Sequence, residues 1–175
     1  EYSYDDLGDR SIGYDIHTDQ TVHIVGAYLQ NEWKTRKWSL LVGGRLDKHN
    51  LVDHVIFSPR VNVRFNPSEA VNLRVSYAGG YRAPQAFDED MHIAIVKRVR
   101  IRLADDLREE RSHSVSLSAD LYHTFGKVQT NLLVEGFYTI LDDVFALRDM
   151  DDAADGGKVK ERYNGSGDTV RGFNV

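Results

Sequence analysis

Residues 59–84 show the clearest alternation of apolar and polar side chains in the sequence. In the stretches 60–65 and 71–77 every second residue is apolar, and this period of two predicts β-strands with one apolar and one polar face. The connection 66–70 contains Asn, Pro and Ser, which favour turns. We therefore predict a β-hairpin. Its apolar face is expected to hold Val61, Val63, Phe65, Val71, Leu73, Val75 and Tyr77, and its polar face Arg60, Asn62, Arg64, Asn72, Arg74 and Ser76.

The same period predicts strands on both sides of the hairpin. Residues 20–33 alternate poorly, and residues 1–19, which carry scattered aspartates and two glycines, are predicted to be a loop with at most a short strand. A row of serines opposite Val115, Leu117 and Leu121 suits a strand with one wet face. In all, strands are expected at 20–33, 38–47, 59–65, 71–77, 112–121, 128–141, 158–164 and 169–175.

The connections between these strands alternate in length. Up-and-down transmembrane barrels have short turns at one rim and longer loops at the other. The expected strands, roughly 8–14 residues long, bracket the 9–11 residues that cross a bilayer at a tilt. Short turns are expected at 34–37, 66–70, 124–127 and 165–168, and long loops at 48–58, 81–111 and 142–157.

The predicted fold is all-β: an antiparallel up-and-down meander of about seven or eight strands. The chain 1–175 is expected to form one segment of a large transmembrane β-barrel. Because the patterns at both ends of the sequence are weak or abrupt, we expect an open, curved sheet rather than a closed cylinder. Within the longest loop, residues 93–110 fit a short cationic strand, but Val99, Leu103 and Leu107 also have helical spacing, so periodicity leaves both alternatives open.

Composition narrows the function classes. The formal net charge of −5 argues against a general nucleic-acid-binding protein, which is usually basic. The sequence contains no cysteine, so it offers neither disulfides nor thiolate metal ligands. No run approaches the roughly 18 apolar residues of a membrane helix, and the mean hydropathy is −0.45. A transmembrane barrel has the same low hydropathy, because only alternate residues face lipid.

The end of the hairpin carries a more specific signal. After Gly79-Gly80, the residues Tyr81-Arg82-Ala83-Pro84 resemble the "FRAP" sequence with which barrel strands of TonB-dependent outer-membrane receptors lead into an extracellular loop. Residues 104–112 stand where that family closes the loop with a motif like "NP.LKPE.S". Leu107, Glu110 and Ser112 match that motif and Arg108 keeps its basic character, whereas Asp105 and Glu109 replace its two prolines.

This resemblance implies part of a bacterial outer-membrane receptor that takes up a scarce ligand of siderophore, haem or cobalamin type with energy from TonB. The implied partners are outer-membrane lipid, the small-molecule ligand, a plug domain and TonB. It implies neither catalysis nor a cofactor. Two alternatives from other classes are a small eight-stranded outer-membrane barrel for adhesion or anchoring, and a soluble β-sheet binding domain.

Candidate site residues follow from the same resemblance, because the loops of such receptors face the exterior and contact ligand. Arg82 has two interpretations, a salt bridge that braces the loop exit or a direct ligand contact, and the nearby acidic residues can equally form a solvated face. We expect ligand selectivity to reside in the three long loops. The candidate ligand-binding residues are Tyr81, Arg82, Asp88, Glu89, Asp90 and His92.

Other chemical motifs are weak. Asp149, Asp151, Asp152, Asp155 and Gly156 resemble a calcium-binding loop, but the required glycine and bidentate glutamate cannot both be placed, so a solvated acidic loop is the alternative. The sequence has no HExxH zinc motif, no GxSxG nucleophile motif and no phosphate-binding glycine loop before a helix. No catalytic or metal site is therefore predicted.

Overall fold

The computed structural model describes residues 1–11, 16–84, 99–151 and 158–175. None of these residues belongs to a helix that is long and apolar enough to cross a membrane. The strands are β1 (Tyr2–Ser11), β2 (Ile16–Lys34), β3 (Trp38–His49), β4 (Val55–Ser68), β5 (Val71–Arg82), β6 (Val99–Leu103), β7 (Glu110–Phe125), β8 (Val128–Asp142), β9 (Phe145–Asp149), β10 (Lys158–Asn164) and β11 (Asp168–Asn174).

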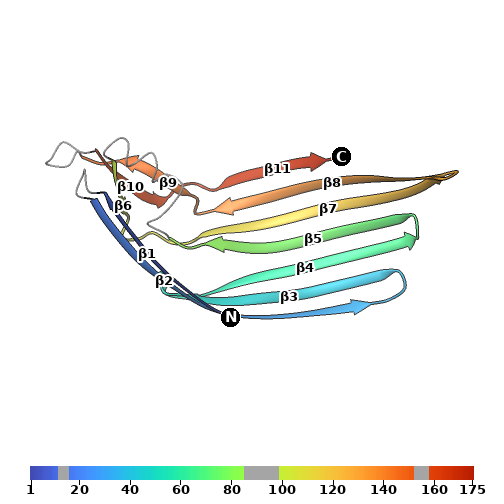
Figure 1. The fold of residues 1–175 in the computed structure, drawn as a ribbon, viewed down its shortest axis with the longest axis horizontal. Helices are drawn as coiled ribbons and strands as arrows, with labels where there is room; N and C mark the ends of the chain where they lie inside the picture. Colours follow the sequence, from blue (N-terminus) through green and yellow to red (C-terminus); the bar gives the residue numbers. More distant parts are fainter. Residues whose placement is uncertain (12–15, 85–98, 152–157) are drawn as a thin grey trace.

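Eight of the strands form one curved sheet in the order β1-β2-β3-β4-β5-β7-β8-β11 (Figure 1). Each strand pairs antiparallel with the strand before it in this order. Strands β1 and β11 lie at opposite edges and do not pair with each other. The prediction of an open antiparallel meander is confirmed.

Short connections gather at one end of the sheet, where β2 meets β3, β4 meets β5 and β7 meets β8 (Figure 1). The last of these is a two-residue turn in which Gly126 has φ of 63°, a left-handed conformation that glycine adopts without steric cost. The connections after β3, β5 and β8 are longer and lie at the opposite end. The connections therefore alternate in length from β2 to β11, although the connection after β3, residues 50–54, is shorter than the predicted loop 48–58.

The expectation of a loop over 1–19 is wrong. Strand β1 pairs with β2 from Tyr2 opposite Val25 to Ser11 opposite Ile16. This hairpin extends toward the end with the long connections (Figure 1). A strand that continues past the apolar band needs no apolar face, which explains why alternation failed to reveal it.

A second difference concerns residues 158–164. They form a strand, β10, but β10 belongs to a separate three-stranded sheet in the order β6-β10-β9. The predicted short turn 165–168 is therefore not a turn between barrel strands, because β10 lies within the connection from β8 to β11. Strand β6 pairs parallel with β10 and β9 pairs antiparallel with it. Residues 99–103 thus take the strand alternative that the sequence had left open.

The register places apolar and polar side chains on opposite faces, as predicted. Val61 stands opposite Tyr77 and Val63 opposite Val75, while Asn62 stands opposite Ser76. Because directly paired residues point to the same face, the apolar set forms one surface across β3 to β8. Its members remain exposed, including Leu40, Val42, Leu73, Val75, Val115 and Leu117. Such a surface suits contact with lipid.

A lysine on this surface is expected to be costly. In a full-length receptor containing this segment, Val75→Lys should lower the free energy of unfolding by about 2–4 kcal/mol near the bilayer midplane. The matched change Ser76→Lys, on the other face of β5, should cost less. Urea unfolding in lipid vesicles measures both. Equal losses would show that the apolar face does not meet lipid.

Candidate functional site

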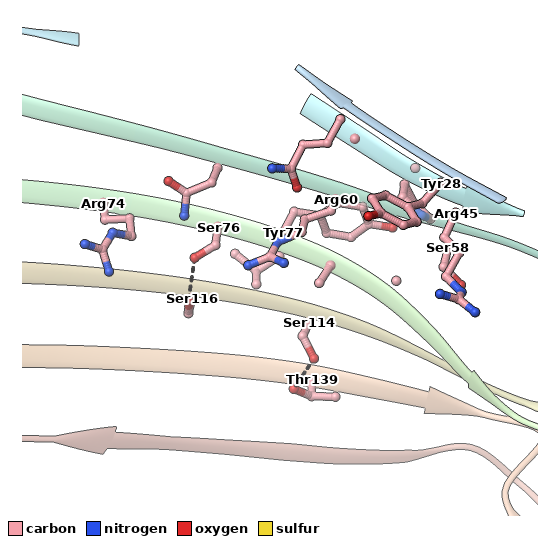
Figure 2. A pocket seen from close by; sticks show the side chains of 18 of the residues that line it. Tyr28, Arg45, Ser58, Arg60, Arg74, Ser76, Tyr77, Ser114, Ser116 and Thr139 are labelled. Atoms are coloured by element: carbon pink, nitrogen blue, oxygen red, sulfur yellow. Dashed lines mark hydrogen bonds between the residues drawn. The ribbon is translucent and has the colours of Figure 1, made fainter. Parts of the chain in front are cut away.

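A hollow of about 720 Å³ crosses the polar face of the main sheet from β2 to β8 (Figure 2). A depression that spans six neighbouring strands identifies this face as the concave one. Basic, hydroxyl and amide side chains line much of it. They include Tyr28, Arg45, Ser58, Arg60, Asn62 and Arg74.

Small hydroxyl side chains form the middle of the hollow. Ser76 and Ser116 hydrogen-bond at 2.9 Å, and Ser114 and Thr139 at 2.8 Å, across neighbouring strands (Figure 2). These pairs satisfy one another and occupy little space, so the larger polar side chains around them have room to contact a ligand.

Two arginines give the hollow unpaired positive charge. Arg60 and Arg74 have no ion pair or hydrogen bond among the described residues, and both are exposed. Arg74 also stands directly opposite Arg64. In contrast, Arg45 donates to Asp47 at 2.8 Å and to Glu1 at 2.7 Å. The free guanidinium groups can bind an anion with several parallel hydrogen bonds.

At the rim, Arg82 links the end of β5 to the start of β7 and to the connection after β8. Its Nε and Nη2 donate to Glu110 at 2.6 and 2.9 Å. Its guanidinium carbon lies 4.9 Å from the centre of the Phe145 ring. The backbone N–H of Phe145 donates to Glu110 as well. Three strands, β5, β7 and β9, therefore meet at this pair.

A second cluster joins the connection after β3 to β7. His54 Nε2 lies 2.9 Å from Glu109 Oε1, and Arg111 donates to the same oxygen at 2.8 Å. The Glu109 side chain is almost completely buried. Burial alone would raise the pKa of Glu109, but the hydrogen bonds from Arg111 and the backbone and the charge of His54 outweigh it and lower that pKa.

Asn164 makes a further link between the connections after β5 and β8. Its side-chain oxygen accepts from the Arg108 N–H at 2.7 Å, and its amide donates to the carbonyls of Arg108 and Asp143 at 2.9 and 2.8 Å. Arg108 also pairs with Asp143 at 3.1 Å. With the β6–β10 ladder, these contacts join the connections after β5 and β8 into one unit at the rim.

The sequence profile described as "TonB dependent receptor-like, beta-barrel" matches residues 1–175. The chain belongs to the TonB-dependent receptor family. Receptors of this family reside in the bacterial outer membrane, transport rather than catalyse, and have the barrel of which this sheet is part. This assignment replaces the alternatives of a small adhesion barrel and a soluble binding domain.

Solved TonB-dependent receptors share the fold. The siderophore receptor PirA from Pseudomonas aeruginosa matches with a TM-score of 0.71 and 16% identity, over 89% of this chain and 31% of that receptor. The FrpB iron transporter from Neisseria meningitidis matches with 0.64 and 21% identity, over 89% and 23%. A variant of the ferric enterobactin receptor PfeA from Pseudomonas aeruginosa matches with 0.64 and 19% identity, over 89% and 24%. No curated protein matches the chain.

The chain thus spans between about a quarter and a third of these receptors. Of its predicted site residues, Tyr81 packs against the apolar rim cluster of Val52, Ile56 and Ala83. Arg82 braces the loop exit as its structural interpretation predicted. Asp88, Glu89, Asp90 and His92 lie outside the described residues. Ligand binding by these six residues stays a prediction.

The acidic loop also remains without a metal assignment. Asp149 pairs with Lys160 at 3.3 Å, whereas Asp152 and Asp155 lie outside the described residues. Within residues 1–11, 16–84, 99–151 and 158–175, no three acidic or histidine side chains gather to hold a metal ion.

The free arginines Arg60 and Arg74 were not among the predicted site residues, although their alternation with apolar residues predicted their face.

The Arg82–Glu110 pair is expected to hold the TonB-dependent receptor's rim together. Arg82→Ala, Glu110→Ala and the double variant should give a coupling free energy of up to about 1 kcal/mol, because the arginine is half exposed. Hydrogen exchange of residues 143–149 measures local opening. Arg102→Ala is the control, since its pair with Asp105 is exposed and 3.8 Å long. Additive single effects would show that the pair does not brace the rim.

Acid should open the contact between Glu109 and His54. A carboxylate with a lowered pKa stabilises the fold at pH above its ordinary value of 4.5, and this contribution is lost as the pH falls through the lower folded value. Limited proteolysis between pH 7 and 3 is expected to show cutting near residues 104–109 rising at the acidic end. Glu109→Gln should remove this pH dependence, whereas Asp106→Asn should keep it. A Glu109→Gln receptor with an unchanged pH profile would contradict the assignment.

Proposed function

We propose that the receptor containing this segment takes up an anionic iron chelate of siderophore type, with energy from TonB. The observation that supports this ligand class is the pair of free guanidinium groups, Arg60 and Arg74, in the concave hollow. Carboxylate, catecholate and hydroxamate chelates present oxygen acceptors that suit such donors. The related receptors described as siderophore and iron transporters support the same class.

Haem and cobalamin are the alternative ligand classes to an iron chelate. Haem carries carboxylates that arginines can bind, but it also needs a large apolar contact surface. The lining of the hollow contains many polar residues and three glycines, and Tyr28 and Phe137 are the lining aromatic residues that share the polar face. This lining favours a polar anionic chelate over haem.

A transport assay tests the concave site. In the full-length receptor, Arg60→Ala combined with Arg74→Ala should weaken binding of a ferric chelate by tenfold or more, since hydrogen bonds to charged groups contribute about 1.5–3 kcal/mol each. The measurement is uptake and binding of radioactive iron presented on a panel of chelators, haem and cobalamin. Arg36→Ala in the short turn after β2 is the matched control.

The expected loss is confined to anionic ligands. If the double variant binds and transports every ligand as the wild type does while still inserting into the membrane, the concave arginines are not the ligand site. If only haem or only cobalamin is transported, the ligand class is wrong.

Selectivity is proposed to reside in the loops at the rim, including Tyr81, Arg82, Asp88, Glu89, Asp90 and His92. Loops at the end of a rigid sheet can change without loss of ladder hydrogen bonds. Replacing residues 86–97 by a short flexible linker keeps Arg82, β6 and the Glu110 anchor in place. The linker variant should change ligand preference across the same panel. An unchanged preference in a correctly inserted receptor would contradict this role.

A further inference from the structure

The apolar outer face contains a second hollow, of about 670 Å³, that spans β7, β8 and β11. A glycine produces it. Gly136 stands opposite both Leu117 and Phe173, so two exposed side chains flank a position that has none. A Cβ at Gly136 would find its nearest atom, the Gly172 carbonyl oxygen, 4.0 Å away. The hollow therefore has space for a substituent from outside the protein.

An arginine lies beside this hollow. Arg171 stands opposite Tyr138, shares its face with Val115 and is exposed. It has no ion pair among the described residues. An unpaired cation on a lipid-facing surface is unfavourable unless it reaches the head groups or finds an anion.

The position of Arg171 along the strands places it near the extracellular end of the apolar band. Toward the end of the sheet with the long connections, the residues that follow Val115 on the same face of β7 are His113 and Arg111. On β8 the residues that follow Tyr138 in this direction are Ile140 and Asp142. Tyr77 donates to or accepts from His113 at 2.8 Å at this level, as polar pairs do at a membrane boundary. At about 3.3 Å per residue, the long Arg171 side chain can reach the head-group layer while its stem stays against apolar surface.

We propose that this outer hollow binds one lipid of the outer leaflet whose head group carries phosphate. An acyl chain lies in the depression at Gly136 between Leu117 and Phe173, and the phosphate oxygens accept hydrogen bonds from the Arg171 guanidinium. Charge complementarity selects this occupant over a neutral lipid, because the hollow has apolar walls and Arg171 is the cationic residue that lines it. The site lies on the opposite face from the ligand hollow and is independent of the proposed transport function.

Native mass spectrometry of the detergent-purified, full-length receptor tests the site, with diphosphoryl lipid A and its dephosphorylated form as probes. Arg171→Gln should weaken binding of the phosphorylated probe by about tenfold and leave the dephosphorylated probe unchanged. Gly136→Leu places an apolar side chain in the depression, where its Cβ has no atom nearer than 4.0 Å, and should weaken both probes. The controls are Arg36→Gln in a short turn and Ala27→Leu, which adds an apolar side chain to the outer face of β2.

Each outcome decides the proposal. Binding of the phosphorylated probe that is equal in Arg171→Gln, Gly136→Leu and both controls would overturn it. A change in oligomeric state without a change in bound lipid would identify the face as a protein interface and would also overturn it. Heat-modifiable migration on a gel verifies that each variant barrel is folded, so a loss of lipid cannot come from misfolding.

Discussion

The structure depends on the pairing of backbone N–H and C=O groups between neighbouring strands. Hydrocarbon offers these groups no water, so each strand that crosses a bilayer must be paired along both sides. Among the described residues, β3, β4, β5 and β7 are paired on both sides over most of their length. Strand β2 pairs with β1 only up to Val25 and β8 pairs with β11 only from Glu135, while β1 and β11 have one neighbour each. Because backbone hydrogen bonds hold the sheet together, the side chains of the membrane region can be apolar on the lipid face and polar on the opposite face.

The packing of the segment reflects that division. Among the described residues, the buried apolar cluster consists of Val52, Ile56 and Ala83, with Tyr81 against it, at the rim with the long connections, and Val22 and Ala104 are buried outside this cluster. On β3 to β8 most apolar residues point outward, and many hydroxyl and basic residues point into the hollow. The hydrophobic effect therefore acts between this sheet and its surroundings more than within it. The rim, which leaves the hydrocarbon, is held by ion pairs and amide hydrogen bonds instead.

Alternation in the sequence predicted most barrel strands and both faces of β4 and β5, because a half-buried strand must repeat every two residues. It did not reveal β1, whose aspartates and tyrosines lie in a hairpin without an apolar side. It identified β10 as a strand but assigned it to the wrong sheet, since a period of two carries no information on the partner. Alternation also could not predict that Arg60 and Arg74 lack ion-pair partners among the described residues, because this depends on which carboxylates lie across the sheet. Arg82 could be predicted as a brace, since an arginine at the end of a strand commonly finds a carboxylate on the next one.

The parallel pairing of β6 with β10 has a consequence for the order of folding. Their union is reinforced by the contact between Arg108 and Asn164, which are 56 positions apart. Strands β7, β8 and β9 lie between them in the chain, so β6 can pair with β10 only when this intervening segment has brought the two strands together. Contacts of such long separation form slowly, because the intervening chain must be ordered first. We therefore expect the small rim sheet to form after the hairpins of the main sheet, whose strands pair with near neighbours in the chain.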